Sequence, residues 1–291
     1  MRIISFFALL LFINFQNISY AQPSTEVYLL DVIKRDSLLY IENPRNISNN
    51  FGYDNQPYFL PDGTSLFYSS QIGEQTDIIQ YDLRSGQKTI ITSSAGSEYS
   101  PALMPDQNHI STVILEKSGM QLLWKYNLNG TNEKILVPGL KIGYYTWLNS
   151  HLVASFVLGD VVTLQITDIN TYQSKVIFKN IGRSLHTIPG SEILSFVDKN
   201  DPNEWIIKSY DWKKGTIDTI IALPEGCEDY TWTSDGSIIV GQYNQLFIYN
   251  PKSDTTWKTI SIDSRINLGG AISRLAINNE KDKIAIVVEG K

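Results

Sequence analysis

The sequence contains few residues that form disulfide bonds or metal sites. Its 291 residues include one cysteine, Cys227, three histidines and three methionines. One cysteine excludes an internal disulfide. A chain of this length can bury roughly 75% of the surface of its unfolded state in a core, so its stability needs neither a disulfide nor a metal.

Basic residues are outnumbered as well. Lysine and arginine total 24 against 30 aspartates and glutamates, a net charge of −6. Proteins that bind nucleic acid need a basic stripe that displaces counterions from phosphates. We therefore expect no nucleic-acid partner.

Familiar catalytic patterns are also missing from the sequence. It contains no Gly-x-Ser-x-Gly elbow, no His-Glu-x-x-His pair and no glycine-rich phosphate loop before a helix. We therefore expect no catalytic residue, no metal and no cofactor.

The first 21 residues have the pattern of a secretory signal. Met1-Arg2 gives a short positive start, 3–15 is an apolar run, and Ser19-Tyr20-Ala21 is a small-x-small cleavage site. The alternative is a retained membrane anchor, but this run is shorter than the roughly 20 residues of a spanning helix. No later run is apolar enough to span, so we expect an exported chain, periplasmic or secreted, whose single domain covers 22–291.

The rest of the chain repeats one pattern about every 44 residues. An aromatic or apolar residue precedes a turn of the Pro-Asp-Gly kind, and a short apolar strand follows the turn. In successive repeats the first residue of the turn is Pro61, Pro105, Asn149, Pro189, Ser234 and Asn278, at spacings of 44, 44, 40, 45 and 44 residues. Such a fixed period indicates a repeat architecture.

A second marker, first seen as Tyr81-Asp82-Leu83, runs in phase with these turns. It lies between two runs rich in Ile, Val, Leu, Thr and aromatic residues, so each repeat holds four short strands. One four-stranded sheet cannot bury both of its faces, whereas sheets stacked around an axis can. The sequence therefore predicts an all-β, six-bladed β-propeller.

The two ends of the chain supply complementary halves of the sixth blade. After Asn278 one strand pattern remains, 284–288, and the missing strands are found near the start, at 26–32 and 38–41. We expect the N-terminal strands to pair with the C-terminal strands, which leaves no open sheet edge. The alternative is a chain cut midway through an extra blade.

The repeat resembles that of the TolB-like propellers, which are related to the WD type. The resemblance rests on Gln56-Pro57-Tyr58-Phe59-Leu60-Pro61-Asp62-Gly63, on Ser100-Pro101 with Pro105-Asp106, and in part on Thr231-Trp232-Thr233-Ser234-Asp235-Gly236. Three repeats depart from it, with Asn149-Ser150, Pro189-Gly190 and Asn278-Asn279 at the turn. These residues also suit turns, so the resemblance implies a propeller that binds a ligand without indicating which.

In a propeller the innermost strands and the loops that enter them surround a central channel. At these positions the chain carries Asp54, Asn55, Glu98, Tyr99, Tyr144, Tyr145, Ser184, His186, Glu228, Asp229, Tyr230, Ser273 and Arg274. Tyrosines offer flat contact area at a small entropic cost. This ring could bind a cationic or peptide-like partner, or its members could simply be solvated loop residues.

The histidines and two tryptophans have structural interpretations. His109, His151 and His186 fall in different repeats, so we expect them to lie apart, with His186 facing the channel. Trp147 and Trp232 share an aromatic column with Phe59 and are expected to pack between blades.

Two classes of function remain open. The first is a non-catalytic propeller that binds a protein or peptide through its channel mouth or blade-edge loops. The second is a small metal-assisted hydrolase or lactonase, in which Glu98, Glu228 and Asp229 hold a divalent cation in the channel. A sugar-binding or structural role is a further alternative.

Overall fold

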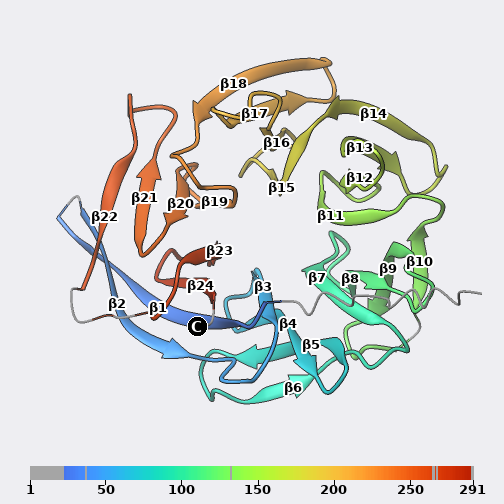
Figure 1. Cartoon of the computed structure of the whole chain (residues 1–291), viewed down its shortest axis with the longest axis horizontal. Helices are drawn as coiled ribbons and strands as arrows, with labels where there is room; N and C mark the ends of the chain where they lie inside the picture. Colours follow the sequence, from blue (N-terminus) through green and yellow to red (C-terminus); the bar gives the residue numbers. More distant parts are fainter. Residues whose placement is uncertain (1–22, 37, 132, 264–265, 267, 290–291) are drawn as a thin grey trace, which may run out of the picture.

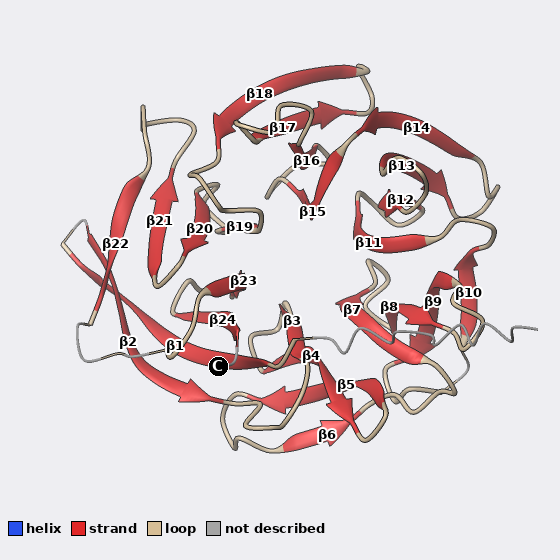
Figure 2. Ribbon diagram, in the orientation of Figure 1, coloured by secondary structure: helices blue, strands red, loops and turns tan. Residues whose placement is uncertain are grey.

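The computed structural model describes residues 23–36, 38–131, 133–263, 266 and 268–289. The predicted secretory signal at 1–21 lies outside these residues. The described part of the chain forms 24 β-strands and no helix. Figure 2 shows it as strands joined by loops. Figure 1 shows the strands arranged in sheets around a central axis, which is a β-propeller, as predicted.

Four of the sheets contain four antiparallel strands each, taken in chain order. They consist of β3 (Asp54–Phe59), β4 (Ser65–Ile72), β5 (Gln75–Asp82) and β6 (Lys88–Ile90); β7 (Ser97–Leu103), β8 (His109–Leu115), β9 (Gln121–Asn127) and β10 (Lys134–Val137); β11 (Ile142–Trp147), β12 (Leu152–Val157), β13 (Thr163–Asp168) and β14 (Ser174–Lys179); and β15 (Ile181–Thr187), β16 (Leu194–Asp198), β17 (Ile206–Asp211) and β18 (Thr216–Ala222).

The remaining strands form one eight-stranded sheet in the order β19-β20-β21-β22-β2-β1-β24-β23. Its strands are β1 (Thr25–Arg35), β2 (Leu38–Asn46), β19 (Tyr230–Trp232), β20 (Ile238–Gln242), β21 (Gln245–Tyr249), β22 (Lys258–Ile262), β23 (Ile272–Ile277) and β24 (Lys283–Glu289).

The predicted pairing between the two ends of the chain is confirmed. Strand β1 pairs antiparallel with β24 over seven residues, from Thr25 opposite Glu289 to Asp31 opposite Lys283. β24 also pairs with β23, so residues from both ends build one sheet. Each end of the chain carries only half of a repeat, which is why the sequence predicted that the two ends pair.

The eight-stranded sheet itself was not predicted. It arises because β2 pairs in parallel with β22 at two positions, Tyr40 opposite Ser261 and Ile41 opposite Ile262. β1 and β2 are long, with 11 and 9 residues, so their hairpin extends beyond β24 to the outer strand of the neighbouring sheet (Figure 1). This contact covers an edge that would otherwise be open to another chain.

The core lies between neighbouring sheets. In β4 the six residues Ser65–Ser70 are all buried, although side chains alternate between the two faces of a strand. A strand buried on both faces must have a packed layer on each side. The stacking of sheets around the axis therefore buries both faces of this strand.

A hydrogen-bond pattern that recurs along the chain joins neighbouring sheets. The Tyr145 hydroxyl and the Trp147 indole N–H both donate to Ser111 Oγ, at 2.8 and 2.9 Å. Two repeats later, the Tyr230 hydroxyl and the Trp232 indole N–H both donate to Ser195 Oγ, at 2.9 and 2.8 Å. Trp147 and Trp232 thus pack between sheets, as predicted.

Ser155 occupies the same repeat position as Ser111 and Ser195, six residues after the turn marker, but lacks these donors. The next inner strand carries Leu185 and Thr187 where the others carry tyrosine and tryptophan. The Ser155 hydroxyl is buried without a hydrogen-bond partner in the described part of the chain. Ser155 is therefore a control for Ser111 and Ser195, whose hydroxyl oxygens accept these hydrogen bonds.

We expect Ser195→Ala to lower the free energy of unfolding by about 2–4 kcal/mol, because it removes the acceptor shared by two largely buried donors. Ser155→Ala should change it by less than about 0.5 kcal/mol or stabilise slightly, because no bond is lost. Both serines are fully buried, so the pair isolates the hydrogen bonds from the packing. Urea unfolding of both variants measures the difference, and equal losses would contradict the assignment.

Candidate functional site

A cavity of about 360 Å³ occupies the central channel. Strands from every sheet contribute to its wall: β3, β7, β11, β15, β19 and β23 (Figure 1). The repeats place equivalent strand positions at the same depth in the channel, so one cavity collects side chains from far apart in the sequence. Its volume lies in the usual range for ligand pockets.

The structure brings together about half of the predicted channel residues. Those that line the cavity are Tyr144, Tyr145, Ser184, His186, Asp229, Tyr230 and Arg274. Six others do not line it: Asp54, Asn55, Glu98, Tyr99, Glu228 and Ser273.

Asp54 and Glu98 lie inside their sheets, and both are fully buried. Asp54 Oδ1 accepts a hydrogen bond from Ser70 Oγ at 2.5 Å, and burial raises the pKa of this carboxyl to about 6. Burial likewise raises the pKa of the Glu98 carboxyl to about 7, although the hydroxyls of Thr92 and Tyr126 donate to it. Asp54 thus joins β3 to β4, and Glu98 joins β7 to β9 and to the segment after β6; neither lines the cavity.

Asn55 and Tyr99 also have structural partners. Asn55 Oδ1 accepts a hydrogen bond from the Gln56 backbone N–H at 2.8 Å. Tyr99 packs edge-to-face on Tyr53, with ring centroids 5.8 Å apart. Both residues support the channel wall from behind.

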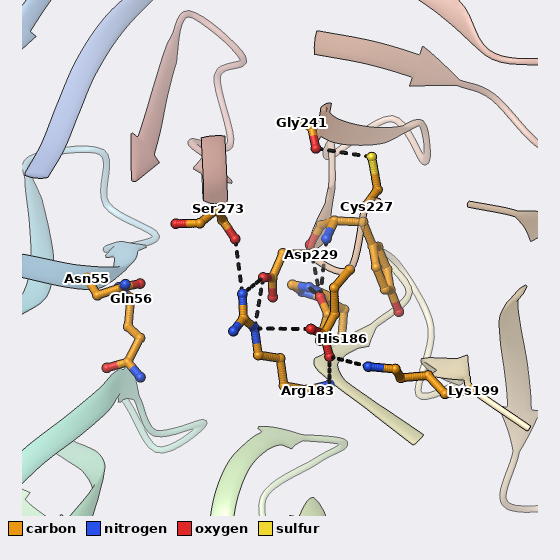
Figure 3. Close-up of polar contacts among 12 residues, drawn as sticks. Asn55, Gln56, Arg183, His186, Lys199, Cys227, Asp229, Gly241 and Ser273 are labelled. Atoms are coloured by element: carbon orange, nitrogen blue, oxygen red, sulfur yellow. Dashed lines mark hydrogen bonds and ion pairs between the residues drawn. The ribbon is translucent and has the colours of Figure 1, made fainter. Parts of the chain in front are cut away.

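Arg183, which the sequence interpretation omitted, is central to the site. Its Nε and one terminal nitrogen bind Asp229 Oδ2 at 2.9 and 2.5 Å, and the same terminal nitrogen reaches the Ser273 carbonyl at 3.3 Å (Figure 3). Asp229 is buried and Arg183 half-buried. Because Arg183 stands six residues before its turn marker, as do Asn55, Tyr99 and Glu228, a strict alignment of the repeats would have found it.

Glu228 lies behind this ion pair. Its carboxylate is 3.3 Å from Lys199 Nζ and 4.0 Å from Arg183 Nε. Lys199 also lies over the ring of Trp205, 3.6 Å from its centroid. Two carboxylates and two cations thus balance each other on this side of the channel.

Arg274 is different, because no carboxylate in the described residues binds it. Its guanidinium lies over the ring of Tyr144, 4.8 Å from the centroid, and makes no hydrogen bond within that part of the chain. An arginine over an aromatic ring is held by the ring's negative face and keeps its N–H groups available at the edge. Arg274 and Tyr144 both line the cavity.

The part of the wall formed by β3 and β7 contains two strained positions. Gln56 and Ser100 have positive φ values of 58° and 53°, a region that residues other than glycine rarely adopt. Each lies at an irregularity in strand pairing, between Asn55 and Tyr58 and between Tyr99 and Ala102. Gln56 Oε1 ties the two together by accepting from the Ser100 backbone N–H at 2.9 Å. Such strain concentrates at functional sites.

Ser184 and His186 form a pair that superficially resembles a nucleophile and its base. Ser184 Oγ is 3.1 Å from His186 Nε2, but it also accepts from the Tyr230 N–H and contacts the Tyr230 carbonyl, both at 3.3 Å. Burial lowers the pKa of the His186 imidazole to about 4, which makes it a weak base at neutral pH. The pair therefore joins two sheets and leaves His186 neutral in the channel wall.

The remaining two histidines lie elsewhere, as expected. His109 Nδ1 is 2.7 Å from Asp106 Oδ2 in an outer turn, and His151 is near Ser150 in another. Among the residues that the structure describes, no three His, Cys, Asp or Glu side chains gather in a way that could hold a metal ion.

The two ends of the cavity differ in polarity. Arg183, Asp229, Arg274 and Tyr144 lie four to six residues before the turn markers, whereas Tyr58, Leu103, Trp147 and Leu275 lie two or three residues before them. Position along equivalent strands sets depth in the channel. The charged side chains therefore lie toward one end of the cavity, whereas the other end carries these aromatic and apolar side chains together with His186 and two threonines.

Solved structures with the same fold are numerous. A putative TolB from Agrobacterium tumefaciens has a TM-score of 0.70 at 10% identity, covering 93% of this chain and 99% of that one. A chain of a nidogen/laminin complex has a TM-score of 0.61 at 10% identity, over 92% of this chain and 99% of that one. An oligogalacturonate lyase in complex with manganese has a TM-score of 0.60 at 12% identity, over 85% and 80%.

The sequence matches no protein-family model and no curated protein. The chain has the TolB-like β-propeller fold that the repeat pattern indicated. Identities of 10–12% establish a shared fold and no shared activity. In the described residues no helix is long and apolar enough to cross a bilayer.

Proposed function

We propose that this chain is an exported, non-catalytic binding protein that takes a protein or peptide ligand at its central channel. The observation that carries the proposal is the cavity in the channel, walled by all six inner strands with tyrosines, a tryptophan and polar groups. Aromatic side chains at the edge of a cavity give a ligand large contact area, while few polar groups fix its orientation.

The proposal includes the architecture of the whole chain. We count six blades by dividing the eight-stranded sheet into β19–β22 and the group formed by β23, β24, β1 and β2, because only the short parallel contact of β2 with β22 joins them. Residues 1–21 act as the secretory signal and residues 22–291 form a single domain. The protein then works in the periplasm or outside the cell.

The geometry favours binding over catalysis because the groups that could act as a base or a nucleophile are already paired. Asp229 is neutralised by Arg183, and the Ser184 hydroxyl is used between sheets. The similar propeller in the nidogen/laminin complex is part of a protein complex. A peptide of one or two residues matches the volume of the cavity, and the surrounding loops would hold the rest of the partner.

A steric block of the channel tests this proposal. We expect Ala102→Trp, which places an indole at a cavity-lining position, to abolish capture of a partner from the cell envelope that the wild-type protein retains. Ala95→Trp, on an exposed loop, is the matched control and should retain the partner. Thermal unfolding confirms that both variants are folded, and capture that survives Ala102→Trp would exclude the channel as the binding site.

A metal-assisted hydrolase or lactonase is the second candidate. Its support is the adjacent pair Glu228 and Asp229, together with the similar fold of a lyase crystallised with manganese. The first candidate is favoured because Glu98 is buried in its sheet and Asp229 is bound to Arg183. A rise in melting temperature with millimolar manganese or calcium, lost in Asp229→Asn, would favour the enzyme instead.

A further inference from the structure

The charges around the cavity do not cancel. Three charged side chains line it: Arg183, Asp229 and Arg274. Asp229 neutralises Arg183 through two hydrogen bonds, and Glu228 behind them is matched by Lys199. His186 is neutral because burial lowers its pKa to about 4. Arg274 thus leaves the cavity with one positive charge, although the whole protein is negative.

No hydrogen-bond acceptor in the described residues binds this charge, although the Asp229 carboxylate favours it through space and offsets the effect of burial on the pKa of Arg274. Arg274 is half-buried, with its guanidinium over the Tyr144 ring. A buried or half-buried cation without an acceptor loses hydration that the Tyr144 ring replaces only in part. A ligand with one negative charge would restore the balance, and a cationic ligand would worsen it.

A second unpartnered group lies in the same wall. Ser100 Oγ is buried without a hydrogen-bond partner in the described residues, and Ser100 lines the cavity. Ser100 and Tyr144 both stand five residues before their turn markers, and Arg274 stands four before its own. The three therefore lie at nearly the same depth, on three different strands that face the axis.

From these observations we infer that the channel recognises a carboxylate, with Arg274 as its anchor. Ser100 Oγ, which is covered in the observed conformation, becomes an additional donor once its side chain rotates toward the ligand. The inference rests on the proposed function and names the chemistry of the ligand. An arginine fork suits the two oxygens of a carboxylate. The apolar end, formed by Tyr58, Leu103 and Trp147, would take a hydrophobic side chain close to that carboxylate.

A peptide offers a carboxylate from two sources, its C-terminus or an acidic side chain. The experiment uses N-acetylated tripeptides that end in leucine, phenylalanine, tyrosine or tryptophan, each as the free acid and as the amide. A third set ends in the same residues as amides but carries glutamate at the middle position. Binding is measured by calorimetry on the wild-type protein, so the main comparison needs no variant.

We expect at least one free-acid or glutamate peptide to bind at least tenfold more tightly than its uncharged amide. A preference for the free acids assigns the C-terminal carboxylate, and a preference for the glutamate set assigns an acidic side chain. Because one charge-assisted contact is lost, Arg274→Gln should remove this preference, and Arg274→Lys should restore part of it. The surface variant Arg35→Gln removes the same charge and should leave the preference unchanged.

The outcomes separate this inference from the proposed function. Equal affinity for acids and amides overturns the carboxylate inference but leaves a peptide-binding channel. The carboxylate inference is also overturned, and the binding channel retained, if Ala102→Trp abolishes partner capture while Arg274→Gln leaves that capture unchanged. If no tripeptide of any set binds, the carboxylate inference is wrong, whatever the capture experiment shows.

Discussion

A chain carrying Leu29→Asp should fail to fold cooperatively. Leu29 is fully buried in β1, where it lies opposite Ala285 of β24 and packs in a cluster with residues of β3, β4 and β5. The change removes an apolar side chain that typically contributes about 2–5 kcal/mol and places a carboxylate in a site without partners. The total is comparable with the whole stability of a domain.

Leu38→Asp is the matched control for this variant. It makes the same chemical change in the same hairpin, but at a side chain that is 55% exposed. We expect a loss of less than about 0.5 kcal/mol. Circular dichroism during heating and hydrogen exchange of the β24 amides measure both effects, since those amides should lose protection only in Leu29→Asp.

A cooperative Leu29→Asp protein with protected β24 amides would contradict the role assigned to β1. It would mean that the ring remains closed without a correctly packed N-terminal strand. The prediction therefore tests the joining of the two ends of the chain and not merely the hydrophobicity of one residue.

The repeat explains how much of the fold the sequence could predict. Turn residues such as those of Pro61-Asp62-Gly63 are required locally, because Gly63 has a φ of 69° that other residues avoid. The turns, and the alternation of apolar and polar residues in the strands, can therefore be recognised from the residues themselves. The parallel contact between Ile41 and Ile262 depends instead on how far a long hairpin extends, and no local pattern encodes it.

The site could be predicted less completely for a related reason. The repeat gives the register of each inner strand, and Tyr144, His186, Asp229 and Arg274 line the cavity. It does not show which face of a strand each residue occupies next to a bulge. Glu98 fits the channel pattern in sequence, yet in the structure it lies beneath the hydroxyl of Tyr126.

The burial of Glu98 leads to the last prediction, a stability that falls as pH rises from about 4.5 to about 7. Burial, together with the neighbouring Asp77 carboxyl, raises the pKa of Glu98 from 4.5 to about 7, so in this range the folded protein retains a proton that the unfolded chain has released. Stability decreases with pH wherever the folded state binds more protons. A shift of this size corresponds to about 3 kcal/mol, present below pH 4.5 and lost above about pH 7.

Glu98→Gln should remove this contribution, because the amide cannot ionise and can still accept the hydrogen bond from Tyr126. At pH 8 the variant should be more stable than the wild type, and near pH 4 the advantage should disappear or reverse. Asp54, with a pKa raised to about 6 by its burial, contributes in the same direction in both proteins and cancels in the comparison.

Urea unfolding at pH 4, 6 and 8 measures the difference, with the exposed Glu225→Gln as the control for a general change in charge. The control should follow the wild-type pH dependence. If Glu98→Gln is instead destabilised equally at every pH, the ionised carboxylate is the form that the Thr92 and Tyr126 hydroxyls stabilise. Glu98 would then act as a charged acceptor between the sheets, and the pH dependence would have to come from other carboxyls.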